Sequence, residues 1–350
     1  MSPEIVITAT AALSPYGIGT AALAAGLQGQ ALPAATPVQG CHGRPVMARQ
    51  VPDYDGRALL GVRSISQFDR LTLHVGVAVD EVLRGLGFAD AKARAAQVPD
   101  DAIGIVLGSS GPLQSIMAFD LQTIADPRYV QPSLVPNVVF NVPASYAAIR
   151  HTMRGSAITL TDGPSSSLKA MALALAQLES GRLSLVLCGA AEEATPAYAL
   201  YAQALAAQRG APQPVLWEGA ALFALETAAH AARHGRVPRA ALVGCAQAFA
   251  PRDPQAALAQ ALHRLQATHP AAMREVSRVW ADSAALAARA GLGALKVHEL
   301  GRLQAELGTL PGALAVLDLV TDPAVGRGEL ALVVQAEADG CGAAALLRRF

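Results

Sequence analysis

One segment, residues 155 to 193, restricts the fold of this chain more than any other. It contains the pattern of a strand, a turn, a long helix and a second strand in direct succession. Ala157 to Thr161 is a short strand-forming run, and Asp162-Gly163 then breaks the pattern. Pro164 follows, and its fixed φ suits the first position of a helix. Three serines come next, so hydroxyl groups gather where the predicted helix begins.

The two elements after the turn indicate burial. From Leu168 to the stop at Gly181 the chain is apolar on nearly all sides of a helix, and the run Leu183 to Cys188 is mostly hydrophobic. A strand covered on both faces has this composition. The segment therefore predicts a buried βαβ unit whose turn is a place to look for chemistry.

Composition excludes several classes of protein. The hydrophobic content of 52% in 350 residues excludes a disordered chain and provides a core for one large domain or two ordinary ones. Lys+Arg and Asp+Glu balance at 27 each, so no overall field attracts nucleic acid or an acidic membrane surface. The four cysteines form no CxxC pair. We therefore expect free thiols in a reducing compartment.

The N-terminal region suggests neither export nor a membrane span. The chain begins Met-Ser-Pro-Glu without a basic segment, which disfavours a secretory signal. No charge occurs between Glu4 and Arg44, but prolines, glycines and glutamines interrupt this stretch well short of the roughly 18 apolar residues that a span needs. We expect a cytoplasmic protein without a membrane span.

Strands and helices alternate along the whole chain, which favours an α/β architecture, with two similar halves as one arrangement. The other strand-like runs are Ile5–Ala9, Ile103–Leu107, Gly219–Glu226 and Ala240–Cys245, and the clearest other helices are Phe68–Leu86 and residues 254–267. Further apolar runs, of no assigned type, are Val276–Trp280, Ala313–Leu319 and Glu329–Ala336.

Short motifs occur in a fixed order. They are Ile5-Val-Ile-Thr-Ala with Ser14-Pro-Tyr-Gly17, Asn141-Val-Pro-Ala144, Arg154-Gly155, Ser165-Ser-Ser-Leu168, Cys188-Gly-Ala-Ala-Glu192, Glu218-Gly-Ala-Ala221 and Gly340-Cys-Gly342. Over nearly the full length they resemble the β-ketoacyl synthases, which condense an acyl group with malonyl carried on acyl carrier protein. The resemblance implies a thiolase-like layered αβαβα fold of two similar halves, residues 1–235 with the nucleophile helix and residues 236–350.

The same resemblance implies that the catalytic residues are lost. A ketosynthase needs a thiolate at the start of the nucleophile helix, and Pro164 stands there. The position of the first catalytic histidine is Asp282, and that of the second is Arg302. Asp282 and Arg302 are candidates to pair with each other across the vacated pocket. The stretches Ala194–Trp217 and Ser283–Leu295 are also short, so we expect no complete acyl tunnel.

Other residue patterns leave alternatives open. Ser165 is a fallback nucleophile with His298 as its base, although a helix cap is the commoner role for such a serine. His230 and His234 suit one helix face as metal ligands, but a solvated face is favoured over a metal site. Gly108-Ser-Ser-Gly111 is a phosphate cradle or a structural turn.

The turn around Gly235 carries Arg233, Arg236 and Arg239. It is either a contact for an acidic carrier protein or a solvated loop.

The function implied by the resemblance is that of a chain-length-factor-like subunit. Such a subunit has no independent activity, binds no cofactor or metal, and pairs with an active ketosynthase in polyketide, aryl-polyene-like or specialised fatty acid biosynthesis. Acyl carrier protein is a second expected partner. The family pairs through the strand before the nucleophile helix, here near Ala157 to Thr161. The alternatives are an acyltransferase or hydrolase that uses Ser165, and a free-standing acyl-binding protein.

Overall fold

The computed structural model describes residues 3–38, 45–61, 68–303 and 306–350. Its main feature is a sheet of eleven strands. The strands on the path, in order across the sheet, are β12 (Lys296–Glu299), β11 (Val276–Ala281), β13 (Leu330–Ala336), β14 (Cys341–Arg349), β10 (Ala240–Phe249), β1 (Ile5–Ser14), β9 (Gly219–Thr227), β7 (Leu185–Glu192), β5 (Ile103–Gly108) and β6 (Ala157–Leu160), with β2 (Gly17–Ile18) on β1. A small second sheet contains β3 (Thr36–Val38), β4 (Val46–Arg49) and β8 (Val215–Trp217).

The large sheet has two parts that meet at one short pairing. Strands from residues 5 to 227 form one part and strands from residues 240 to 349 form the other. They join where β1 pairs antiparallel with β10, Ile5 opposite Leu242 and Ile7 opposite Ala240. The division of the chain at residue 235 stays a prediction, and this arrangement agrees with it.

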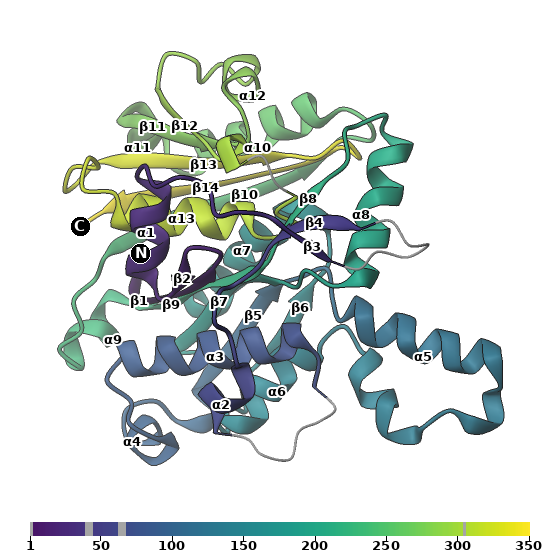
Figure 1. Cartoon of the computed structure of the whole chain (residues 1–350). Helices are drawn as coiled ribbons and strands as arrows, with labels where there is room; N and C mark the ends of the chain where they lie inside the picture. The colour runs from purple at the N-terminus through teal and green to yellow at the C-terminus, as the bar shows by residue number, and fades with distance from the viewer. Residues whose placement is uncertain (1–2, 39–44, 62–67, 304–305) are drawn as a thin grey trace.

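Helices form layers around and between the two parts, as Figure 1 shows. On the outside of the first part lie α3 (Arg70–Gly85) and α6 (Val142–Arg150). Between the two parts lie α7 (Ser166–Glu179) and α13 (Pro311–Thr321), and α10 (Pro254–Thr268) covers the second part from outside. The predicted thiolase-like αβαβα layering is confirmed.

The remaining helices are shorter or peripheral. They are α1 (Thr20–Leu27), α2 (Gly56–Leu60), α4 (Ala91–Ala95), α5 (Leu113–Ala125), α8 (Pro196–Gln208), α9 (Ala228–Arg233), α11 (Pro270–Arg274) and α12 (Ala284–Arg289). Within the described residues, no helix combines the length and apolar composition that crossing a membrane requires.

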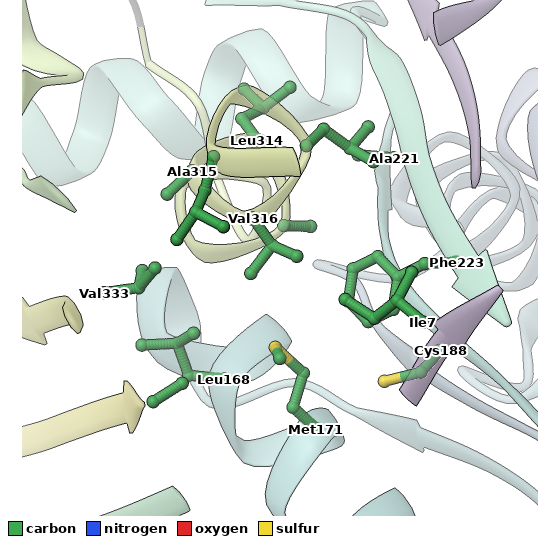
Figure 2. Close-up of a cluster of buried hydrophobic side chains, with 14 of the residues drawn as sticks. Ile7, Leu168, Met171, Cys188, Ala221, Phe223, Leu314, Ala315, Val316 and Val333 are labelled. Carbon is green, nitrogen blue, oxygen red and sulfur yellow. The ribbon is translucent and has the colours of Figure 1, made fainter. Parts of the chain in front are cut away.

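The central layer explains the composition of α7. Leu168 and Met171 of α7 pack with Leu314 and Val316 of α13 and with Phe223 of β9 (Figure 2). The small alanines of α7 let it lie between the two parts of the large sheet, and Ala170 and Ala174 are fully buried. The helix is apolar all round because both of its sides are covered, as the sequence predicts.

The start of α3 shows how polar residues set element boundaries. The predicted helix Phe68–Leu86 begins at Arg70, because the Asp69 side chain accepts a hydrogen bond from the Thr72 amide at 2.9 Å and caps the first turn. The predicted irregular segment Leu134–Pro143 overlaps a 3-10 helix at Pro132–Val138 and includes the start of α6.

Candidate functional site

The turn between β6 and α7 has the shape that the sequence predicts. Gly163, Pro164 and Ser165 form a 3-10 turn that leads into α7. Gly163 has φ +76°, a conformation that favours glycine. The Ser166 hydroxyl accepts from the Asp162 amide at 2.8 Å and donates to the Gly163 carbonyl at 2.7 Å. Pro164 therefore stands at the entrance of the helix, where the family resemblance places the nucleophile.

Pro164 opens onto a pocket of about 540 Å³. Much of the remaining lining comes from the β13–β14 hairpin and from α8. The lining residues are Ser110, Thr161, Asp162, Gly163, Pro164, Tyr198, Tyr201, Leu205, Arg209, Phe249, Glu306, Gly308, Glu337, Asp339 and Cys341. We call this cavity the Pro164 pocket. Its lining includes four carboxylates, at Asp162, Glu306, Glu337 and Asp339.

Glu337 lies at the N-terminal end of α7. Its Oε1 accepts a hydrogen bond from the Ser165 amide at 2.6 Å. Pro164 has no N–H, so Ser165 carries the amide that follows the nucleophile position. Burial raises the pKa of Glu337, although the hydrogen bond from Ser165 lowers it. An internal carboxylate thus occupies a donor that would otherwise face a ligand.

Asp282 directly follows β11, and its carboxyl group is within electrostatic reach of Glu337. Burial raises the pKa of Asp282 to about 6, with a further contribution from the Glu337 charge. The next segment along the sheet is adjacent, because the Gly301 amide donates to the Asp282 carbonyl at 3.1 Å. The side chain of Arg302 lies outside the described part of the structure. Pairing of Asp282 with Arg302 therefore stays a prediction.

Glu306 is a pocket residue that the sequence analysis did not select. It lies four residues beyond Arg302 and lines the Pro164 pocket. Its backbone is fixed on both sides, since its amide donates to the Val215 carbonyl at 2.7 Å and its carbonyl accepts from the Trp217 amide at 3.0 Å. Glu337 was missed as well. Glu306 lies outside the named helices and strands, and Glu337 directly follows β13; no sequence motif marks either position.

The structure does not bring Ser165 and His298 together. Ser165 is fully buried, and its hydroxyl has no hydrogen-bond partner. His298 lies on β12, where its ring stacks on Trp280 at 4.2 Å and its Nε2 is 3.4 Å from Arg278 Nη1. His298 lines a different pocket, of about 590 Å³, beside Asp318. No described contact joins the two fallback residues.

Behind the Pro164 pocket, Glu192 ties two loops together. Its Oε1 accepts hydrogen bonds from the amide and hydroxyl of Ser110, at 3.1 and 2.8 Å, and of Thr309, at 2.9 and 2.7 Å. Burial raises the pKa of Glu192 to about 7. These bonds show that the Gly108–Gly111 segment is a structural turn, because an internal carboxylate already occupies the Ser110 donors.

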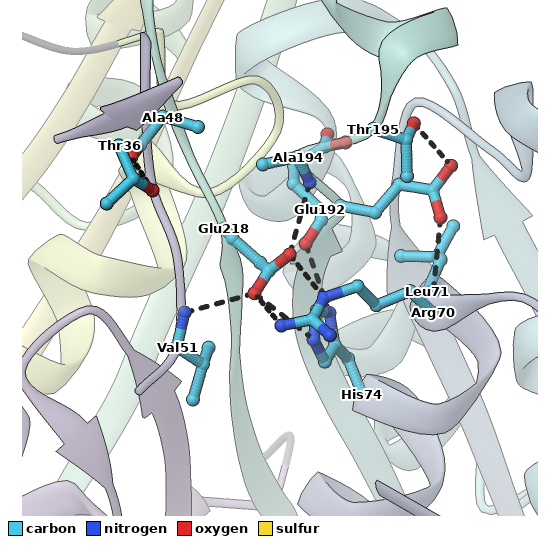
Figure 3. Close-up of polar contacts among 11 residues, drawn as sticks. Thr36, Ala48, Val51, Arg70, Leu71, His74, Glu192, Ala194, Thr195 and Glu218 are labelled. Carbon is cyan, nitrogen blue, oxygen red and sulfur yellow. Dashed lines mark hydrogen bonds and ion pairs between the residues drawn. The ribbon is translucent and has the colours of Figure 1, made fainter. Parts of the chain in front are cut away.

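Glu218 organises the polar contacts in Figure 3. Arg70 contacts it through two hydrogen bonds, at 2.6 and 2.7 Å, and the amides of Val51 and Ala194 donate to it at 3.0 and 3.4 Å. The buried His74 lies 3.7 Å away, and burial lowers its pKa to about 4. Glu193, on the same segment as Ala194, accepts hydrogen bonds from the Leu71 amide of α3 and the Gln114 amide of α5. The two glutamates therefore hold the starts of both helices.

The predicted solvated face at His230 and His234 is wrong for His230. It is 6% exposed, and its Nδ1 lies 2.6 Å from Glu226 Oε2. Arg236 joins the same carboxylate at 2.7 Å, so it is not part of a solvated basic loop. The described residues include no group of three or more His, Cys, Asp or Glu side chains that could hold a metal ion.

Apolar side chains are exposed along the segment from α5 to the start of α6, and β6 is an edge strand. β6 is the last strand of the sheet, and all four of its residues are half-buried. Asn141 ties this strand to α6 through its bonds to the Ala157 carbonyl and the Thr159 hydroxyl. Large exposed apolar side chains lie on α5 and on the segment that leads to α6: Leu121, Ile124, Val135, Val139 and Phe140. We call these five residues and β6 the β6 surface.

Comparisons with known proteins extend the resemblance. The family model described as Beta-ketoacyl synthase, N-terminal domain, matches residues 50–212. The solved ishigamide ketosynthase/chain length factor is 30% identical, with a TM-score of 0.82 over 99% of this chain and 99% of that chain. A search of curated proteins gives no match.

Two further solved structures share the fold at lower identity, and each comparison covers 100% of both chains. A β-ketoacyl synthase from Burkholderia phymatum STM815 has a TM-score of 0.82 at 18% identity. A type II PKS acyl-carrier protein in complex with its ketosynthase, bound to the hexaketide, gives a TM-score of 0.79 at 16% identity.

Proposed function

Because this chain belongs to the β-ketoacyl synthase family, we propose that it is the non-catalytic subunit of a heterodimeric ketosynthase, similar in role to a chain length factor. Its partner would be an active ketosynthase, and the pathway would make a polyketide, an aryl-polyene-like product or a specialised fatty acid. The 30% identity to a ketosynthase/chain length factor structure supports the proposal. The observation that carries it is the chemistry of the Pro164 pocket.

The Pro164 pocket lacks what condensation needs. The reaction requires a thiolate nucleophile and hydrogen-bond donors aimed at a developing oxyanion. Pro164 offers neither, and the next amide, at Ser165, already donates to Glu337. Cys341 lines the same pocket, but burial raises the pKa of its thiol, which disfavours the thiolate.

The carboxylates also oppose the charge that forms in condensation. Decarboxylation of malonyl leaves negative charge on the reacting group, and the pocket lining has four carboxylates, at Asp162, Glu306, Glu337 and Asp339, against one arginine, Arg209. Like charges repel, so a lining rich in carboxylates disfavours this step. The pocket therefore suits a subunit that leaves chemistry to its partner.

The β6 surface supports pairing. An open sheet edge, and exposed apolar side chains such as Leu121 and Ile124 on α5, are the kinds of surface that a stable complex covers. Acyl carrier protein remains a second proposed partner of the assembled complex, since the ketosynthase of one similar structure is bound by its carrier protein.

Co-expression with a ketosynthase encoded in the same source tests the proposal. We expect a one-to-one complex with condensing activity. Changing the nucleophilic cysteine of the partner to alanine should abolish this activity. Changing Ser165 of this chain to alanine should leave the activity unchanged. Peptide mass spectrometry after incubation with an acyl carrier substrate should show an acyl group on the partner alone. An acyl adduct on Ser165 or Cys341 would contradict a non-catalytic role.

The persistence of a pocket of about 540 Å³ favours one alternative, a free-standing acyl-binding protein. Native mass spectrometry separates the two functions. A small bound ligand on the isolated chain, with no complex on co-expression, would favour the alternative.

A further inference from the structure

A lysine and a cysteine are in contact beside the Pro164 pocket. Lys169 lies near the start of α7, and Cys341 is the first residue of β14. The Lys169 Nζ donates a hydrogen bond to the Cys341 Sγ at 3.4 Å. Because α7 directly follows β6 of the first part of the sheet and β14 belongs to the second part, this contact joins the two parts.

Neighbouring groups hold both side chains in place. The Cys341 amide donates to Asp339 Oδ1 at 3.1 Å, and the Cys341 carbonyl accepts from the Glu337 amide at 2.8 Å. The Lys169 Nζ also donates to Asp162 Oδ2 at 3.0 Å, and the Lys169 side chain is 11% exposed. The amine therefore stays within reach of the sulfur.

Cys341 is open to small solutes. It lines the Pro164 pocket and is half-buried, whereas Cys188 is fully buried. Oxidation of a thiol depends on its exposure and on the fraction that is thiolate. An oxidant as small as hydrogen peroxide that enters the pocket therefore meets the Cys341 sulfur with an amine beside it.

Both groups are mainly protonated at neutral pH. Burial raises the pKa of the Cys341 thiol, although the charge of Lys169 acts in the opposite direction. Burial opposes the charge on Lys169, but the hydrogen bond and charge of Asp162 raise the pKa of this amine. The negative charges of Glu337 and Asp339 also raise the pKa of the thiol. The thiolate and the neutral amine therefore become more abundant as pH rises.

We propose that Lys169 and Cys341 form a modification site, where hydrogen peroxide joins them through a nitrogen–sulfur bond. The Cys341 thiolate attacks peroxide, which gives a sulfenic acid and hydroxide. The neutral Lys169 amine then attacks the sulfur, the S–O bond breaks, and hydroxide leaves as the nitrogen releases a proton. Sulfur is oxidised and peroxide is reduced. One thiol, one amine and one peroxide give one sulfenamide and two molecules of water.

The distance between the two groups supports the second step. A sulfenic acid condenses even with a backbone nitrogen to give a sulfenamide, and Lys169 places a more nucleophilic amine 3.4 Å from the sulfur. Reacting atoms about 3–3.5 Å apart are close to the geometry of attack. The new bond would fasten α7 to β14 and remove the positive charge beside Asp162.

Peptide mass spectrometry after treatment of the isolated chain with hydrogen peroxide tests the site. Cys41 lies outside the described residues, so a Cys41→Ser chain is used to prevent a disulfide with this cysteine. We expect the Lys169 and Cys341 peptides as one linked product, two hydrogens lighter than their sum, which dithiothreitol separates again. The rate of linking should rise about tenfold for each pH unit between about pH 7 and 9.

Two conservative variants and a matched control complete the test. Lys169→Arg keeps the positive charge but lacks the primary amine, so it should give no linked product, and dimedone should label a sulfenic acid on its Cys341. Cys341→Ser should give neither product. Lys296→Arg changes an exposed lysine on β12 and should not alter the linking. Absence of the linked product from the Cys41→Ser chain, or an equal yield from Lys169→Arg, would overturn the proposal. No outcome depends on whether the chain pairs with a ketosynthase.

Discussion

Two substitutions on α5 test the proposed pairing surface. Leu121 and Ile124 lie three positions apart on this helix and are 59% and 80% exposed. Full burial of one such side chain contributes about 1.5–3 kcal/mol. For the exposed parts of both, we estimate about 3 kcal/mol of binding free energy. The double variant Leu121→Glu/Ile124→Glu should lose at least this amount, because it also places charges in an apolar contact.

The expected consequence is a dissociation constant for the ketosynthase partner raised at least about a hundredfold. Affinity would be measured by biolayer interferometry, with the isolated chain as analyte. The melting temperature of the isolated variant should stay close to that of the unmodified chain, because both side chains are exposed in it.

Val237→Glu is the matched control, since Val237 is as exposed as Ile124 but lies in the turn before β10. It should leave the affinity unchanged. If the α5 variant binds the partner as tightly as Val237→Glu does, α5 is not part of the interface and the reasoning is refuted.

Three other predictions concern the site and its supports. Pro164→Cys should gain no condensing activity in an assay with acyl and malonyl carrier substrates. The reason is that Glu337 still accepts the hydrogen bond from the Ser165 amide and that carboxylates still line the pocket. Measurable product from the isolated Pro164→Cys variant would contradict this prediction. Arg70→Leu leaves Glu218 buried without its main partner and should lower the free energy of unfolding by about 3 kcal/mol in urea titration. The matched change at an exposed arginine, Arg182→Leu, should alter it by less than about 0.5 kcal/mol. Burial, with Asp69 nearby, raises the pKa of Glu193 to about 8, and burial raises that of Glu192 to about 7. The folded state then holds these protons more tightly than the unfolded state, so their stabilisation is complete below about pH 4.5 and is lost as pH rises through about 7 to 8. Glu193→Gln should flatten this decline in urea titrations between about pH 5 and 9, and an unchanged slope would show that Glu193 does not cause it.

The fold was predictable where apolar runs have a clear period or a clear cap. The strand Gly219–Glu226 and the helix at residues 254–267 match β9 and α10 within a residue or two. The run Ala313–Leu319 could not be typed, because α13 is buried on all sides and shows no amphipathic period. Burial of this kind is a tertiary property, which a single segment does not reveal.

The site was predictable in part, for a related reason. The family resemblance supplied Pro164 and Asp282, and the structure places Asp282 directly after β11 and Pro164 in the 3-10 turn that leads into α7. Glu306 was missed because it lies outside the named helices and strands, where no spacing rule gives the register. Glu337 directly follows the apolar run Glu329–Ala336, as Asp282 follows β11, but no family motif pointed to it. The exposure of His230 was predicted wrongly because its partner Glu226 lies on β9, outside the helix face that was considered. The contact depends on how α9 folds back against the end of β9.

The central claim is that this chain contributes a surface and no nucleophile to a ketosynthase pair. Its most direct test is native mass spectrometry of the chain co-expressed with its candidate ketosynthase and then incubated with acyl carrier substrate. The proposed function predicts a one-to-one complex that carries one acyl group, located on the partner by peptide mapping. An isolated monomer, or an acyl group on this chain, would contradict it.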